Sequence, residues 1–81
     1  MVRLRVREVA EATRGPGGEE EPRINRAKLG RVADVSATTM DKIWLDEGYI
    51  SVRLDTLLRI ADALSTLKNR KITVHDLIAV D

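Results

Sequence analysis

Residues 24–44 constrain the fold of this chain more than any other segment, because they hold two short helical patterns joined by a very tight turn. The segment reads INRAKLGRVADVSATTMDKIW. Apolar residues recur at helical spacing on each side of Asp34, a residue type that tolerates the left-handed conformation better than most, although less well than glycine. We therefore expect two helices connected by one turn. The predicted buried positions are Leu29, Val32, Ala33, Met40 and Ile43.

Each of these two helices also has the residues that begin a helix. Asn25 and Ser36 are favoured N-cap residues, because their side-chain oxygens accept a hydrogen bond from a backbone N–H of the first turn. Apolar residues before and after each cap can pack together as a hydrophobic staple. The staple pairs are Ile24 with Leu29 and Val35 with Met40. This pattern is typical of a helix-turn-helix, whose second helix commonly enters the DNA major groove.

The rest of the chain predicts three further helices in one small domain, residues 1–81. Val2–Val6 alternates apolar and basic residues and is either a short strand or the start of the first helix. The predicted helices cover Val6–Arg14, Leu54–Leu64 and a short segment capped by Thr73. Gly15–Pro22, with the sequence GPGGEEEP, is expected to be a flexible, solvated loop.

Composition excludes several classes of protein. The chain has no cysteine, which removes disulfides and thiolate metal sites and suits a cytoplasmic protein. No apolar run approaches the ~18 residues of a membrane span, and the N-terminus does not have the pattern of a secretory signal. Fourteen basic against 13 acidic residues give a net charge of +1, which argues only weakly for nucleic acid. The bases are nevertheless concentrated in residues 3–7 and 23–31.

With these predicted helices and caps, the chain resembles the Cro/cI-type helix-turn-helix family, also called XRE. The match covers Asn25–Ile43, then RLDTLLRIADAL and ITVHDLI. The resemblance implies an all-α, compact five-helix domain like that of lambda repressor, with the helix-turn-helix at its centre. Gly30, Asp34 and Arg26 stand where the family usually has alanine, glycine and glutamine.

A further departure concerns an ion pair between the first and third helices of many family members. Ala10 and Trp44 occupy the matching positions here. Well-packed apolar groups can often replace a buried ion pair without loss of stability. We therefore predict that Trp44 packs over Ala10.

The resemblance also assigns candidate DNA contacts. A lysine can donate to guanine, a threonine can contact a thymine methyl group, and an aspartate can accept from cytosine N4. The base-reading candidates are Ala37, Thr38, Thr39, Asp41 and Lys42. The candidates for contacting the DNA backbone are Asn25, Arg26, Lys28, Ser36, Tyr49 and Arg53. The alternative for the base-reading set is a merely solvated helix face. Among the backbone candidates Arg26 and Arg53 are preferred, whereas Lys28 and Tyr49 could equally be ordinary solvated side chains. Arg3, Arg5 and Arg7 have the composition of a minor-groove arm, although a basic N-terminus is common.

The predicted function is sequence-specific binding of double-stranded DNA by a small, stand-alone, prokaryotic transcriptional regulator, most simply a repressor in the cytoplasm or nucleoid. A homodimer is expected, formed through Leu77, Ile78 and Val80 or through pairing of Val2–Val6. No enzyme, cofactor, metal site or small-molecule ligand is expected, and the lone His75 lacks a partner ligand. The alternative is a protein-interaction module on the same fold, such as an antitoxin-like partner or a coactivator.

Overall fold

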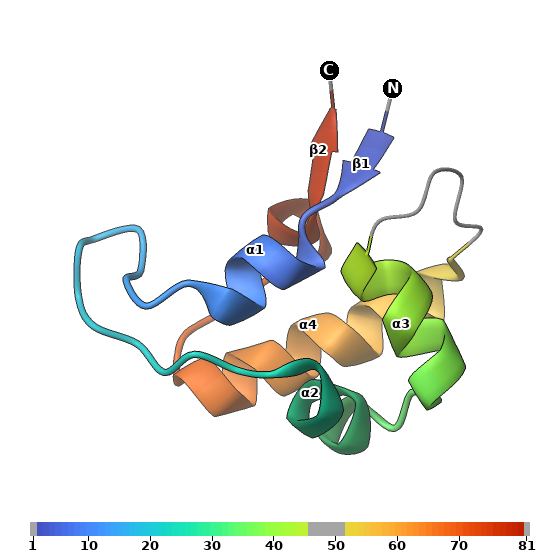
Figure 1. Cartoon of the computed structure of the whole chain (residues 1–81). Helices are drawn as coiled ribbons and strands as arrows, with labels where there is room; N and C mark the ends of the chain where they lie inside the picture. Colours follow the sequence, from blue (N-terminus) through green and yellow to red (C-terminus); the bar gives the residue numbers. More distant parts are fainter. Residues whose placement is uncertain (1, 46–51, 81) are drawn as a thin grey trace.

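The computed structural model describes residues 2–45 and 52–80, which form a small, mostly helical molecule with a two-stranded sheet. The chain runs through β1, α1, α2, α3, α4, the 3-10 helix η1 and β2 (Figure 1). Their bounds are Val2–Leu4, Val6–Glu11, Arg26–Ala33, Ala37–Leu45, Leu54–Lys68, Val74–Leu77 and Ile78–Val80. The mostly helical architecture is therefore as predicted. The two-stranded sheet is a correction to the predicted all-α fold.

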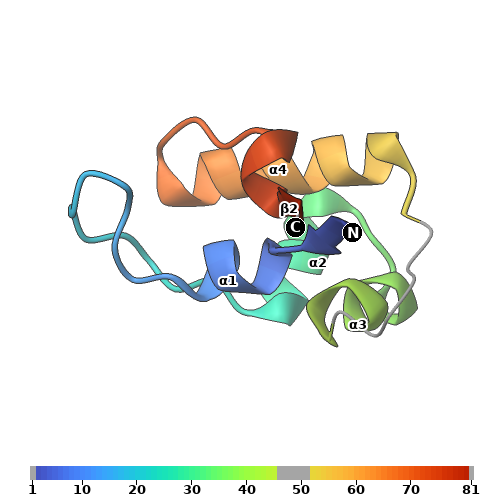
Figure 2. The ribbon, with the colours of Figure 1, turned by 90° about the horizontal axis from the view of Figure 1, so that it is seen from above.

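The core lies where α4 meets the other helices. α4 spans the molecule behind the shorter helices, and the view from above places α1 and α3 on the same side of it (Figures 1 and 2). Leu29, Ile60, Leu64 and Leu77 have no exposed surface. With no phenylalanine in the chain, aliphatic side chains and Met40 fill this interior. The remaining core residues are Val6, Ala10, Ile24, Ala33, Ile43, Leu57, Ala61, Ala63 and Ile72.

The local features predicted for residues 24–44 are present. Asn25 caps α2 by accepting a hydrogen bond from the backbone N–H of Lys28 at 2.8 Å. Asp34 ends the helix in the left-handed conformation, with φ 58° and ψ 49°. The guanidinium of Arg59 on α4 donates to the Asp34 carbonyl at 3.4 Å, so the turn is also tied to the core helix. Val32 was predicted to be buried, but this residue is 46% exposed.

Gly30 allows α2 and α3 to approach closely. A Cβ atom at this position would lie 2.8 Å from Cγ of Met40 and 3.3 Å from the Val35 carbonyl oxygen. Real Cβ atoms do not approach other atoms to 2.8 Å, so either Met40 or the helix would have to move. Glycine, rather than a better helix former, therefore fits the buried Met40 side chain at this crossing.

Gly30→Ala is expected to destabilise the protein even though alanine is the better helix former. The gain in helix propensity is about 1 kcal/mol, whereas overpacking costs about 1–3 kcal/mol. We expect a net loss of about 1 kcal/mol in the free energy of unfolding, measured by urea denaturation. In a Met40→Ala background the clashing atom is absent, and the same substitution should become neutral or stabilising. An increase in stability in the wild-type background would contradict this prediction.

The first helix ends three residues earlier than predicted, at Glu11 rather than Arg14. Ala12 is extended, with φ −61° and ψ 136°. Its carbonyl accepts a hydrogen bond from Lys68 Nζ at 2.9 Å, and the Thr13 carbonyl accepts one from the Glu21 backbone N–H at 3.0 Å. These carbonyls bond to α4 and to the following loop, so the helix does not continue.

The loop after α1 is held by a buried ionic cluster that the solvated-loop prediction did not include. Glu21 is only 3% exposed at its side chain, and Lys68 is 0% exposed. Lys68 Nζ donates to Glu21 Oε1 at 3.0 Å, and Arg70 Nε donates to Glu21 Oε2 at 2.7 Å. Lys68 lies at the end of α4, which therefore extends four residues beyond the predicted Leu64. Glu21, Lys68 and Arg70 are called the Glu21 cluster below.

The C-terminal segment forms one 3-10 turn and a strand instead of a fifth α-helix. Thr73 and Asp76 form the reciprocal hydrogen bonds of a capping box, as the cap prediction required. Ile78 then becomes extended and pairs with Leu4, and Val80 pairs with Val2, in antiparallel register. This pairing replaces further helical turns and confirms the strand interpretation of the N-terminus. Leu77 is fully buried, so it cannot contribute to the predicted dimer surface, and Val6 begins α1 instead of extending the N-terminal strand.

Candidate nucleic-acid interface

The outer surface of α3 presents most of the residues predicted to read bases. Met40 and Ile43 point into the core, and the opposite side of the helix faces solvent. Thr39 and Asp41 lie at the border between these two sides and are partly buried. The inward positions of Met40 and Ile43 are therefore as predicted, whereas Asp41, predicted to lie on the outer side, is at the border. The exposed candidates are Ala37, Thr38 and Lys42.

Two of the predicted DNA-backbone contacts are used as helix caps. Asn25 Oδ1 accepts from the backbone N–H of Lys28, and Ser36 Oγ accepts from the backbone N–H of Thr39 at 3.3 Å. Ser36 Oγ also lies 2.9 Å from Thr39 Oγ1, to which it donates. Both caps are exposed, and they fix the first turns of α2 and α3. The backbone N–H groups and the partial positive charge of a helix N-terminus favour an anion such as a DNA phosphate.

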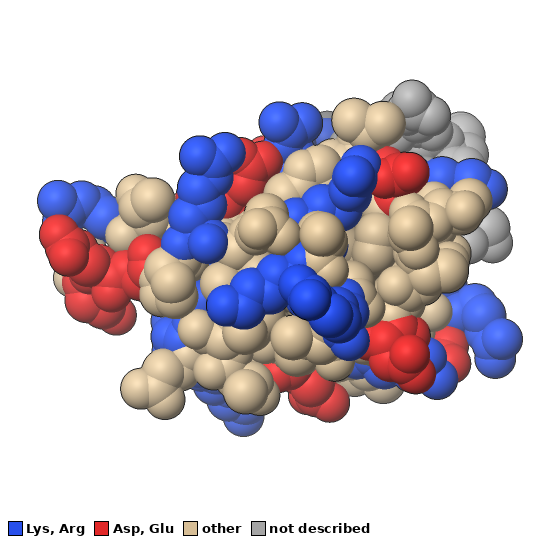
Figure 3. Space-filling model, turned by 60° about the horizontal axis from the view of Figure 1, so that its bottom comes forward, with Lys and Arg blue, Asp and Glu red and all other residues tan. Residues whose placement is uncertain are grey.

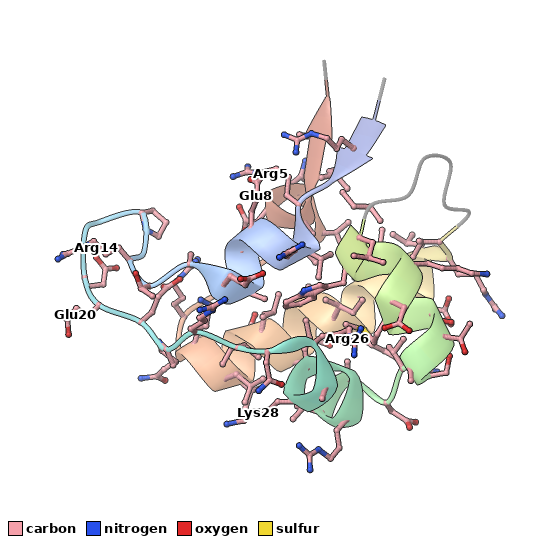
Figure 4. The ribbon with its side chains drawn as sticks, in the orientation of Figure 1. Arg5, Glu8, Arg14, Glu20, Arg26 and Lys28 are labelled. Carbon is pink, nitrogen blue, oxygen red and sulfur yellow. The ribbon has the colours of Figure 1, made fainter. Side chains whose placement is uncertain are left out.

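Arg26 and Asp41, predicted separately as a phosphate contact and a base reader, form an ion pair with each other. Nη1 of Arg26, the first residue of α2, contacts Oδ1 of Asp41 in the middle of α3. About half of each side chain remains exposed, 50% for Arg26 and 49% for Asp41. Figure 4 shows Arg26 directed from α2 toward α3, whereas Lys28 points away from that helix.

The remaining backbone-contact candidates are separated along the chain. Arg53 precedes α4, is 84% exposed at its side chain, and lies 3.3 Å from Oδ1 of Asp55 through Nε. Lys28 is exposed on α2. Tyr49 lies outside the described residues. Sequence reasoning did not single out Arg31 and Arg59, two further exposed arginines at the end of α2 and on α4. The contact of Arg59 with the turn depends on how α4 crosses α2, which the sequence pattern does not specify.

The charge on this side of the molecule is mixed. Figure 3, which brings the lower side of Figure 1 forward, shows Lys and Arg side chains spread over the surface with Asp and Glu side chains among them. The interspersed acids include Asp34 at the turn and Asp41 on α3. An acidic side chain near a duplex repels the DNA phosphates. This mixture of charges therefore predicts a low non-specific affinity for DNA.

The N-terminal arginines do not form a separate arm. Arg3 lies in β1, and its Nη1 donates to Glu8 at 3.1 Å, while Arg5 Nε donates to the same carboxylate at 3.0 Å. Hydrogen bonds from Arg5 and Arg3 hold the pKa of Glu8 below its ordinary value. Glu11 is bonded in the same way by Arg7 and Arg23, which lower its pKa. These arginines are thus held against α1 by the two glutamates.

Trp44 lies at the boundary between α1 and α3. It is partly buried and packs against the core cluster that contains Ala10, which is consistent with the predicted replacement of an ion pair by apolar packing. Trp44 is also one of the residues that line an open hollow of about 350 Å³. This hollow has both arginine and glutamate side chains on its wall. The other lining residues are Arg3, Leu4, Arg7, Glu8, Glu11, Ile43 and Leu45.

Residues 2–45 and 52–80 contain neither a cluster of metal-ligating side chains nor a helix suited to a membrane. The side chains described there include no group of three or more metal-ligating residues, and His75 is exposed beside Asp76 in η1. In the same part of the chain, no helix has the length and apolar character needed to cross a bilayer.

Comparison with known proteins adds no assignment. No protein-family model matches this chain, and searches of characterised proteins and of solved structures find no significant match.

Proposed function

We propose that this protein binds double-stranded DNA through α2 and α3, as a small transcriptional regulator with a helix-turn-helix related to those of the Cro/cI type. The observation that carries the proposal is the geometry of residues 25–45. Two capped helices meet at a left-handed Asp34, and the second presents small and polar residues on its outer side. Apart from exposed Leu45 at its C-terminal end, this outer surface of α3 carries small and polar side chains, which suits insertion into a major groove.

In the proposed complex, α3 enters the major groove and α2 lies across the DNA backbone. Thr38 and Lys42 are exposed, and they offer a methyl group for thymine and a cationic donor for guanine. Arg53 and the N-terminus of α2 contact phosphates and fix the register of α3 without reading sequence. Bound at a promoter, the protein would block access of the polymerase, which makes repression the simplest outcome.

A single copy of α3 reads only a few base pairs, so we propose that two copies bind a palindromic site. The half-sites would be centred roughly 10 base pairs apart, one turn of the duplex. The first experiment is selection of the purified protein on a random duplex library, followed by sequencing. A palindrome supports the dimeric regulator, and a single short site supports a monomeric one. No enrichment at low salt would overturn the proposal of DNA binding.

Substitutions on α3 and before α4 should separate base reading from phosphate contact. Lys42→Ala and Thr38→Ala are expected to relax the preference for particular bases, each at a cost of about 1–3 kcal/mol on the enriched site. Arg53→Ala should weaken all duplexes alike and reduce the slope of log Kd against log salt by about 0.9. Fluorescence anisotropy with the enriched and a scrambled duplex measures both effects.

The charge-matched control is Arg14→Ala. Arg14 lies in the loop after α1, at the end of the molecule away from α3, and its Nη1 donates to the Gly18 carbonyl (Figure 4). Its removal should leave both duplex affinities within about twofold of the wild type, apart from a small long-range effect of charge. Equal losses from Thr38→Ala, Lys42→Ala and Arg53→Ala would contradict the division into base-reading and backbone-contacting residues.

The mixed charge of the α2–α3 side supports one second candidate, a protein-interaction module that uses the same two helices. Exposed Val32 beside polar residues is compatible with a protein partner. Salt distinguishes the two candidates, because DNA binding weakens steeply with ionic strength whereas an apolar protein contact does not.

A further inference from the structure

We propose that the Arg26–Asp41 ion pair couples phosphate binding to base recognition, so that Asp41 holds Arg26 away from DNA until a suitable base releases it. This inference rests on the proposed DNA binding and concerns the specificity of the same site. It starts from the contact between Arg26 Nη1 and Asp41 Oδ1, which joins the first residue of α2 to the middle of α3.

Both partners are placed where a duplex would meet the protein. Arg26 follows the cap Asn25, at the end of α2 where backbone N–H groups favour phosphate. Asp41 precedes Lys42 on α3 and borders its outer surface. With the pair intact, the charge of Arg26 is neutralised by Asp41, and Oδ1 of Asp41 contacts the guanidinium but accepts no well-aligned hydrogen bond from the described residues. The free protein therefore presents neither a full phosphate contact nor a full base-reading carboxylate at this point.

The pair is exposed enough for DNA to exchange it. Both side chains are about half exposed, at 50% and 49%, although Oδ1 of Asp41 itself is covered, and a partly exposed ion pair without a well-aligned hydrogen bond is weak. A guanidinium also carries donors beyond Nη1 and binds phosphate readily in a bidentate fashion. A phosphate beside α2 can therefore take Arg26 from Asp41 at small cost.

The cost depends on what Asp41 then meets. Beside a cytosine, its carboxylate accepts from the N4 amino group and keeps a hydrogen-bond partner. Beside the other bases it is left as an unpaired negative charge near phosphates, which is unfavourable. On a duplex with a suitably placed cytosine, Arg26 is released and both contacts form. On other duplexes the pair persists, and Arg26 contributes little to binding.

The test is Asp41→Asn, with Glu20→Gln as the matched control, because both remove one negative charge and Glu20 lies in the loop far from α3 (Figure 4). The probes are the duplex enriched by the wild-type protein and a scrambled duplex. Asp41→Asn is expected to raise affinity for the scrambled duplex about three- to tenfold, and to steepen its salt slope by about 0.9 because Arg26 becomes free. The ratio of the two affinities should fall about tenfold, and one cytosine preference should disappear from a repeated selection.

A double-substitution cycle completes the test. In an Arg26→Gln background, Asp41→Asn should no longer steepen the salt slope for the scrambled duplex, because the arginine that it releases is then absent, so the effects of the two substitutions on the slope should be non-additive. If Asp41→Asn and Glu20→Gln give the same affinities and salt slopes, the coupling is overturned while DNA binding stands. The coupling is also overturned if Asp41→Asn steepens the salt slope as much in the Arg26→Gln background as in the wild-type protein. If the wild-type protein binds neither duplex at low salt, the proposed function fails and this inference fails with it.

Discussion

Glu21→Ala is expected to lower the free energy of unfolding by about 3–5 kcal/mol, the largest effect of any single substitution considered for this protein. The carboxylate is the ionic partner of the fully buried Lys68 and also bonds Arg70. Its removal leaves the ammonium of Lys68 with only the Ala12 carbonyl in place of an opposite charge. A domain of this size has a total stability of about 4–12 kcal/mol, so a large part of it would be lost.

Urea denaturation measures this effect, and Glu20→Ala is the control. Glu20 is exposed and adjacent in sequence, so its replacement removes the same kind of charge from the same loop. We expect its effect to lie within about 0.5 kcal/mol of zero. If Glu21→Ala and Glu20→Ala were equally mild, the Glu21 cluster would have no part in holding the loop to α4.

The stability of the protein is expected to fall in acid between about pH 4.5 and pH 2, with Glu21 as the main cause. The hydrogen bond from Arg70 and the contact with Lys68 lower the pKa of Glu21 from 4.5 to about 2. Because the pKa is lower in the folded state, the stabilisation is fully present above about pH 4.5 and is lost as the folded carboxylate takes up a proton. The contribution lost is about 3 kcal/mol.

Glu21→Gln isolates this contribution, because the amide keeps the shape of the side chain and does not titrate. The stability difference between the wild-type protein and Glu21→Gln should be largest near pH 7 and should shrink between pH 4.5 and pH 2. Glu8 and Glu11 titrate in both proteins and cancel in this comparison. A difference that stays constant from pH 7 to pH 2.5 would show that the charge of Glu21 does not contribute to stability.

Features that depend on neighbouring residues were predictable from the sequence. The caps at Asn25 and Ser36, the left-handed Asp34 and the inward positions of Met40 and Ile43 all follow from spacings within one or two helical turns. Their physical causes are local hydrogen bonding and helical periodicity. The DNA contacts assigned to these helices stay predictions.

Features that join distant residues were not predictable from the same patterns. Glu21 and Lys68 are 47 residues apart, and the acidic loop by itself has the composition of a solvated segment. The helical spacing of residues 74–78 was compatible with an α-helix, but pairing of Ile78 with Leu4 favours a strand there. The Arg26–Asp41 pair was missed because each residue type suggested a separate role, and their approach depends on how α2 crosses α3.

The pairing of β1 with β2 also determines how the protein can be joined to other molecules. Val2 lies opposite Val80, so the two ends of the described chain leave the molecule together, on the side away from α2 (Figure 1). A fluorescent protein, an affinity tag or a surface tether attached at either end would therefore lie on the side away from α2, but β1 is close to the C-terminal end of α3, because Arg3 and Leu4 line the same hollow as Trp44 and Leu45. Immobilised protein should keep α2 accessible, whichever end carries the attachment.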